Sequence, residues 1–303
     1  MISAVTGFFS TIDNATMALW LTLLSAFSHA VFGAINKSGF DPYLNRGAIN
    51  ICYSLMMMPV VVFVVPLPTA PIFAILAVSY FLHLIYEWLQ AAAYVKGDFT
   101  LVYPIVRGTS PVVSAFIAAM LFTEQLGPSQ WFGLLLLSGG IFSLAWVNIR
   151  LKKLDADANK TLVLIIGIAV LTGVMVALFT NLDAYGIRLS GEPFTFLAWF
   201  FFLGGFGFPL VALHRMRKMA VTPPISKLAI RGVIGALFAF SSFGCLMLAT
   251  WYGSVAEAAA LRETSIIFAT IIGVLIFKEK LDLTRLTIIG VIVTGAVLVK
   301  FTW

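Results

Sequence analysis

The stretch that decides the fold is FTLVYPIVRGTSPVVSAFIAAMLFTE, residues 99–124, in which Arg107 is the only charged side chain before Glu124. An apolar segment of this length matches the roughly 20 residues that a helix needs to cross a bilayer. Comparable segments follow one another from Ala15 to Trp303 with short gaps. Of the 303 residues, 61% are hydrophobic and 11% are charged, and the mean hydropathy is +1.02. The chain is therefore predicted to lie in a membrane, with no room for a soluble domain.

A spanning backbone must satisfy its own hydrogen bonds inside a bilayer, and these apolar runs are too long for the strands of a membrane barrel. The spans are therefore predicted to be helices, divided from one another by Pro, Gly and charged residues. The predicted fold is an all-α, polytopic membrane bundle of ten transmembrane helices. They lie near residues 15–35, 47–65, 71–94, 100–122, 129–147, 161–180, 193–213, 228–251, 255–277 and 284–302.

The formal net charge of +6 comes from Lys and Arg in short turns between apolar runs, such as Arg150, Lys152 and Lys153. This distribution predicts membrane orientation and argues against a nucleic-acid partner. Lys and Arg gather in the connections that follow odd-numbered helices. By the positive-inside tendency these connections face the cytoplasm, so both termini are predicted to lie outside.

An internal repeat is visible when Arg107-Gly-Thr-Ser110 is aligned with Arg262-Glu-Thr-Ser265. At the same offset Glu124 aligns with Glu279. The alignment divides the chain into residues 1–150 and 151–303, each with five predicted helices. Because five is odd, the two units are expected to have opposite orientations, an architecture typical of alternating-access transporters.

Each half carries Arg-x-Thr-Ser, an apolar helix, a Glu followed by x-Leu (FTEQL at 122–126, FKEKL at 277–281) and a last helix that contains Gly. This pattern resembles the EamA repeat of the drug/metabolite transporter superfamily. The resemblance implies a ten-helix secondary carrier, usually an inner-membrane exporter of amino acids or other metabolites in bacteria. It also implies a central cavity lined by both repeats.

Polar residues mark one face of the predicted third helix: His83, Glu87, Gln90 and Tyr94 recur at helical spacing. A polar face inside a bilayer must contact protein or water. A carboxylate there is costly and by default indicates an ion, proton or substrate site, so Glu87 is the first candidate. The alternative is that Glu87 pairs permanently with Arg107 or with a hydroxyl group.

Tyr103 and Arg107 share a face of the predicted fourth helix, which also contains two prolines that can kink it. Arg107 has the geometry to bind a substrate carboxylate or phosphate. Its recurrence as Arg262 favours a shared structural role for the pair. On the first helix, His29 is a candidate proton relay or, equally, a hydrogen-bonded packing residue.

Trp88, next to Glu87, is a candidate wall of an aromatic box that would suit an ammonium group. Most tryptophans of membrane proteins instead face lipid or the interface. No nucleotide-binding loop, zinc-protease motif or catalytic triad is visible, so no cofactor, no metal and no catalytic residue is predicted. Glu124 and Glu279 are expected to cap helix ends.

The sequence thus predicts a secondary transporter that exports a small polar organic metabolite such as an amino acid or amine. Protons are a candidate coupling ion, with Glu87 as the coupling residue. Facilitated or inward movement of a quaternary ammonium compound is the alternative. An intramembrane enzyme that uses Glu87, His83 and His29 is a remote third reading. The expected partners are the substrate and the lipid bilayer of the inner membrane. The chain is expected to act as a monomer or homodimer.

Overall fold

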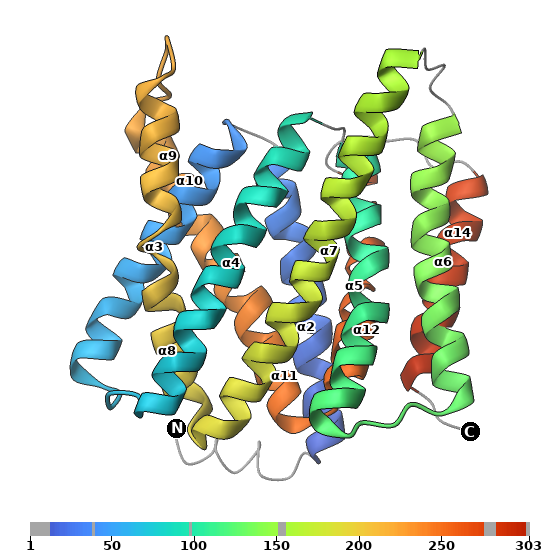
Figure 1. Cartoon of the computed structure of the whole chain (residues 1–303), viewed down its shortest axis with the longest axis horizontal. Helices are drawn as coiled ribbons and strands as arrows, with labels where there is room; N and C mark the ends of the chain where they lie inside the picture. The colour runs from blue at the N-terminus through green and yellow to red at the C-terminus, as the bar shows by residue number, and fades with distance from the viewer. Residues whose placement is uncertain (1–12, 38–39, 97–98, 151–155, 276–282, 301–303) are drawn as a thin grey trace.

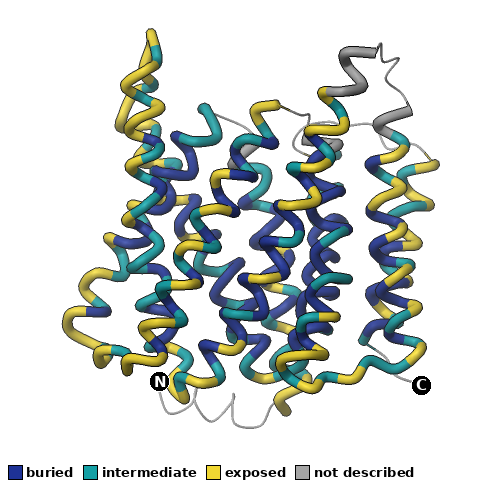
Figure 2. Tube along the Cα trace, viewed as in Figure 1, coloured by how far each residue is buried: buried dark blue, intermediate teal, exposed yellow. Residues whose placement is uncertain are grey.

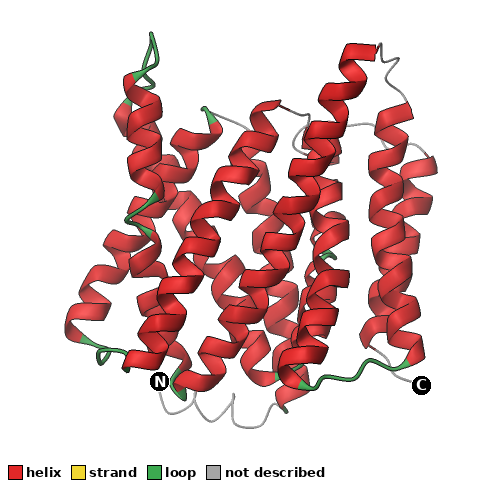
Figure 3. Ribbon diagram, in the orientation of Figure 1, coloured by secondary structure: helices red, strands yellow, loops and turns green. Residues whose placement is uncertain are grey.

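Within the residues that the computed structural model describes, every regular element is a helix (Figure 1, Figure 3). The described residues are 13–37, 40–96, 99–150, 156–275 and 283–300. Nine segments of this part are long and apolar enough to cross a membrane. The predicted all-α, polytopic bundle is therefore confirmed. The second copy of the repeat's Glu-x-Leu motif, with Glu279, lies outside the described residues.

The helices follow the predicted spans closely in the first half and less closely in the second. Their bounds are α2 (Asn14–Lys37), α3 (Pro42–Phe63), α4 (Ala70–Lys96), α5 (Phe99–Phe122), α6 (Pro128–Arg150), α7 (Ala156–Ser190), α8 (Pro193–Gly204), α9 (Phe208–Arg217), α10 (Ile225–Ala239), the π-helical turn η1 (Phe240–Gly244), α11 (Cys245–Tyr252), α12 (Val255–Arg262), α13 (Ser265–Leu275) and α14 (Leu283–Lys300). The helix expected at 161–180 extends to Ser190 as α7.

Three helices that were predicted to be continuous are interrupted in the structure. Between α8 and α9, Gly205 approaches α3 so closely that an added Cβ would lie 2.0 Å from the Cβ of Ser54. The wide turn η1 separates α10 from α11. Between α12 and α13, the Thr264 hydroxyl donates to the Leu261 carbonyl at 2.7 Å and so satisfies a backbone group that the break would leave free. Hydropathy averaged over a whole span did not reveal these breaks, because the helices on both sides of each break are mainly apolar.

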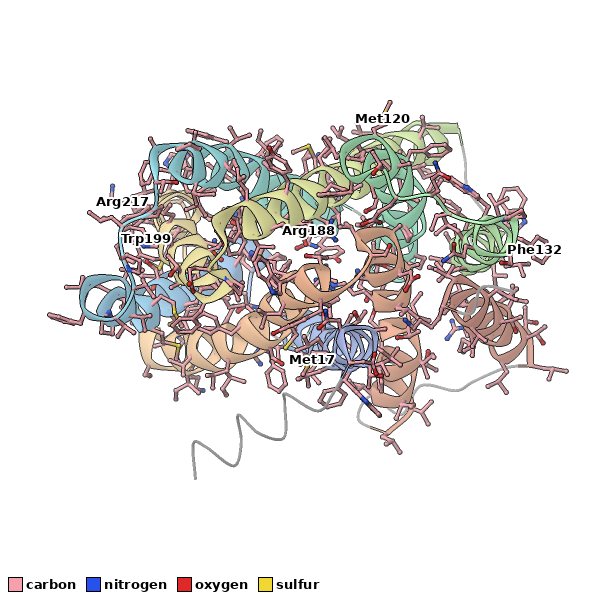
Figure 4. All side chains as sticks on the ribbon, turned by 90° about the horizontal axis from the view of Figure 1, so that it is seen from below. Met17, Met120, Phe132, Arg188, Trp199 and Arg217 are labelled. Atoms are coloured by element: carbon pink, nitrogen blue, oxygen red, sulfur yellow. The ribbon has the colours of Figure 1, made fainter. Side chains whose placement is uncertain are left out.

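The bundle presents apolar side chains outward and buries its polar ones. Buried residues concentrate on the inward faces of the central helices, and exposed residues follow the outer faces (Figure 2). Met120 is 83% exposed and, with Phe132, points away from the bundle (Figure 4). Such a surface requires an apolar solvent, as the hydropathy predicted.

The chain begins and ends its described helices at the same end of the bundle. Figure 1 shows α2 beginning and α14 ending at the lower end, while α9, whose last turn carries Arg215 and Arg217, ends at the opposite one. The separation of this basic turn from the chain ends agrees with the predicted charge pattern. Which end faces the cytoplasm stays a prediction.

Helices α6 and α14 form a closely packed pair at one edge of the bundle (Figure 1, Figure 4). A Cβ added to Gly133 would lie 2.7 Å from the Gly295 carbonyl oxygen, and one added to Gly295 would lie 2.6 Å from the Gly133 oxygen. Small residues allow such backbone contact between membrane helices. The glycines therefore determine how closely this pair packs.

Gly133→Ala is expected to lower the thermal unfolding temperature, Tm, of the purified protein, because the methyl group meets backbone atoms that cannot rotate away. Overpacking of this kind costs about 1–3 kcal/mol. Gly139→Ala on the same helix is the matched control, since a Cβ there meets nothing within 4 Å. Equal Tm values for the two variants would contradict the packing assignment.

Candidate functional site

Glu87 lies on α4 in a buried ion pair with Arg46 of α3. Glu87 Oε1 accepts from Arg46 Nη2 at 2.7 Å, and Oε2 accepts from Asn50 Nδ2 at 2.8 Å. Arg107, the alternative partner that the sequence offered for Glu87, pairs with Glu263 instead. The buried carboxylate is therefore neutralised within the protein.

Arg46 was missed as a site residue because the sequence placed it in the connection before the second helix. The helix begins earlier, at Pro42, and Asp41 caps it by accepting from the Tyr43 amide at 2.9 Å. Asp followed by Pro is a recognised helix-start signal. That signal predicts a start at Pro42 and would have placed Arg46 inside the helix.

His83, one turn before Glu87, pairs with Asp183 of α7. Its Nε2 lies 2.9 Å from Asp183 Oδ2, and Ser79 Oγ donates to the other carboxylate oxygen. His83 also packs on Phe179, with ring centroids 3.9 Å apart. Asp183 was missed as a site residue, although its α-helical spacing from Phe179 places both on the inward face of α7.

A cavity opens beside Glu87 and His83, and aromatic rings form much of its wall. We call it the aromatic cavity; among its lining residues are Tyr53, Tyr80, Phe200 and Phe243. Trp88 is not among them. It is 53% exposed and faces outward from α4, so the expected contribution of Trp88 to an aromatic box is wrong.

A second cavity contains most of the other predicted residues, and we call it the arginine cavity. Residues from six elements line it: His29, Tyr86, Gln90, Tyr94, Tyr103, Val106, Arg107, Val176, Phe179, Phe243 and Arg262. The Gln90 amide donates to the Tyr86 hydroxyl at 2.7 Å. Phe243 lines both cavities and forms part of the wall between them.

Arg107 and Arg262 do not have the same contacts. Arg107 Nη1 donates to Glu263 Oε1 at 3.0 Å, forming an ion pair between α5 and the residue that follows α12. Arg262 Nη2 lies 3.1 Å from His29 Nδ1 and 3.4 Å from Ser242 Oγ. Because a guanidinium can only donate, His29 Nδ1 accepts and its proton is on Nε2.

Glu263 was missed because a continuous helix would direct it about 100° away from Arg262. In the structure α12 ends at Arg262, so this helical angle does not apply.

Irregular backbone borders the arginine cavity on two sides. Phe243 belongs to the π-helical turn η1, and Arg262 is the last residue of α12 before the break. Non-helical backbone at membrane depth is tolerated only where protein buries it or where it lines a cavity. Broken helices around a central site are typical of secondary transporters.

At the end of the bundle where α2 begins, Glu124, Arg188 and Ser254 form a cluster that we call the latch. Glu124 follows α5, and its oxygens accept from the Val255 amide at 3.0 Å, the Ala256 amide at 3.2 Å and the Ser254 hydroxyl at 2.7 Å. Arg188 Nη2 donates to the Gly253 carbonyl at 2.7 Å. Viewed from this end, Arg188 lies near the middle of the bundle (Figure 4). Glu124 therefore caps a helix end, as expected, but the helix is α12.

Glu87→Gln is expected to lower Tm substantially, because it leaves Arg46 buried without a carboxylate. Breaking a buried pair in this way costs about 3–5 kcal/mol. The Arg46→Gln/Glu87→Gln double variant is expected to recover part of the loss, and a double-mutant cycle measures that coupling. Additive losses in the cycle would show that the pair does not act as a unit.

Glu124→Gln is expected to lower Tm by weakening the cap of α12, an effect of about 0.5–2 kcal/mol. Glu192→Gln is the matched control, because Glu192 occupies the N-cap of α8 without a side-chain capping bond. If both variants unfold at the wild-type temperature, the latch does not hold this end of the bundle.

Comparison with known proteins finds a family match in the second half of the chain. Residues 161–301 match the EamA-like transporter family. A solved structure described as "Crystal structure of protein" has a TM-score of 0.69 at 15% identity and covers 94% of this chain and 97% of its own, a likeness that shows the fold alone. No curated protein matches. Residues 161–301 thus carry the EamA domain, which is the signature of the drug/metabolite transporter superfamily.

Proposed function

We propose that the protein is a secondary transporter that moves a small polar organic metabolite, such as an amino acid, by alternating access. The observation that carries this proposal is the ion pair between Arg107 and Glu263 beside a cavity in the middle of the membrane bundle. Charges at this depth are costly, and in membrane proteins they mark substrate or ion pathways. The proposal assigns the cavity to transport and no catalytic role to its residues.

The proposed transport units are residues 1–150 and 151–303, related as inverted repeats. Arg107 and Arg262, which occupy equivalent positions in the two copies of Arg-x-Thr-Ser, line the same cavity. Such convergence is expected of two units that meet at a midplane site. A single chain supplies the whole cavity, which supports a monomer as the smallest working unit.

Alternating access requires the two ends of the bundle to open in turn. The latch joins the end of α5 to the start of α12, and thus a helix of each unit. We assign it to the gate at the end of the bundle where α2 begins and α14 ends. Its hydrogen bonds are only partly buried, so they can break and reform during a transport cycle.

The direction and location of transport follow from the superfamily resemblance: export, across the inner membrane, with both termini outside as the basic turns suggest. Glu87 was our first candidate for proton coupling. Its bonds to Arg46 and Asn50 favour a structural role instead.

Movement of a quaternary ammonium compound is the second candidate function. The aromatic cavity supports it, because Tyr53, Tyr80 and Phe200 present rings beside Glu87. Arg46 opposes it, since its ion pair with Glu87 leaves no net negative charge there to attract a cation. Two buried arginines line the arginine cavity, and a guanidinium binds a carboxylate well, so an amino-acid-like substrate is the stronger proposal.

Counterflow in liposomes tests the proposed activity. Vesicles containing the purified protein and a high internal concentration of unlabelled amino acids are expected to accumulate the matching labelled amino acid transiently, because a carrier exchanges substrate across the membrane. Betaine and choline, treated identically, test the second candidate. Protein-free vesicles are the control. Absence of exchange for every amino acid and amine would reject the transport proposal.

A further inference from the structure

The arginine cavity contains two cations and no carboxylate among its described lining residues. Arg107 and Arg262 are 4% and 3% exposed. Glu263 neutralises Arg107 from outside the lining, whereas Arg262 has a neutral imidazole and a hydroxyl as its nearest partners. Glu87 lies in the neighbouring cavity and is paired with Arg46. The local balance is therefore a surplus of one positive charge.

Each guanidinium also has an N–H group without a partner. Within the described part of the chain, Arg107 Nη2 and Arg262 Nε make no hydrogen bond. Leaving buried charged donors unsatisfied is expensive, and a planar oxyanion satisfies such donors with good geometry. Two buried arginines with unused donors at one cavity thus form a site that is built for an anion.

The other contacts hold Arg262 in place. Its Nη2 is held by His29 of α2 and by Ser242 of η1, and its guanidinium lies 4.9 Å from the ring centroid of Phe243. None of these three contacts involves Arg262 Nε, which is buried and has no hydrogen-bond partner in the described part of the chain. Arg107 is held at Nη1 by Glu263 and lies 5.3 Å from the ring centroid of Tyr103. Pre-oriented donors of this kind lower the entropic cost of binding.

The other residues that line the arginine cavity restrict the chemical nature of the rest of the ligand, next to its anionic group. Val106, Val176 and Phe179 are apolar, and Phe243 separates the site from the aromatic cavity. One carboxylate group balances the surplus charge of the arginines, whereas a dianionic group such as a phosphate ester would leave a buried negative charge. The aliphatic and aromatic wall suits a hydrocarbon body next to the charged group.

We infer that the arginine cavity binds the carboxylate of a small organic monocarboxylate, with Arg107 Nη2 and Arg262 Nε as its principal donors. This inference rests on the proposed transport function and specifies its substrate class: the carboxylate is required for binding and the amino group is not. Phe243, which belongs to both cavities, then contacts the substrate's hydrocarbon part.

Ligand-dependent thermal stabilisation of the purified full-length protein tests the inference. The probes are valine, leucine and phenylalanine, each used as the amino acid, as the des-amino carboxylic acid and as the amino amide, together with inorganic phosphate. For at least one skeleton, the amino acid and the des-amino acid are expected to raise Tm with increasing concentration. The corresponding amide, which keeps only the cation, is expected to leave Tm unchanged.

Substitutions at Arg262 test whether this residue binds the carboxylate. Arg262→Gln is expected to weaken the apparent affinity for the stabilising carboxylate by about tenfold or more, because a charge-assisted bond is lost. Arg262→Lys keeps the positive charge but loses the planar guanidinium group, so this variant is expected to retain part of the affinity for the carboxylate. Arg215→Gln is the control, since Arg215 lies at the surface in a pair with Asp41.

Several results would overturn the inference: amides stabilise as well as acids, phosphate alone stabilises, or Arg262→Gln binds with wild-type affinity. The comparison of acid with amide uses wild-type protein, so it tests whether the carboxylate is required for binding even where a variant does not fold. Counterflow of amines without any response to carboxylates rejects this substrate class while leaving the transport function in place. Absence of all counterflow rejects the transport function itself.

Discussion

The ion pair between Arg107 and Glu263 links the first half of the chain to the second in the middle of the bundle. In the low-dielectric interior of a membrane protein, leaving either of these two charges unpaired is costly. The pair holds Glu263 at the end of α12, next to the point where the helix breaks. It also neutralises Arg107, one of the two arginines that line the cavity. Arg262 is consequently left with neutral partners, and the chemistry of the arginine cavity follows from that difference.

The breaks in the helices and the buried charges lie together for a physical reason. A regular transmembrane helix satisfies its own backbone and offers little to a polar ligand. Where η1 widens and α12 ends, the chain can bring Ser242 and Arg262 toward one cavity. These irregular segments are also points at which a bundle can change conformation without breaking long helices. The candidate site and the irregular segments are therefore the same part of the molecule.

The sequence predicted the position of a site residue well where that position depends only on neighbouring residues in the chain. His29, Tyr103 and Arg262 were expected at a central site and do line one cavity. The prediction that Trp88 forms part of an aromatic box was wrong, because the next position on a helix points about 100° away from Glu87, here toward the outside. Arg46 was missed because a helix start was placed too late, an error that the capping signal at Asp41 could have prevented.

The sequence by itself determined the membrane location, the helical class and the faces on which polar residues lie, because hydropathy and the 3.6-residue period are properties of neighbouring residues. Only the tertiary structure decided which charges pair. Glu87 meets Arg46, Asp183 meets His83, and Arg262 meets neutral groups. These partners come from helices far apart in the chain, and their pairing depends on the packing angles and helix breaks that bring them within hydrogen-bond distance.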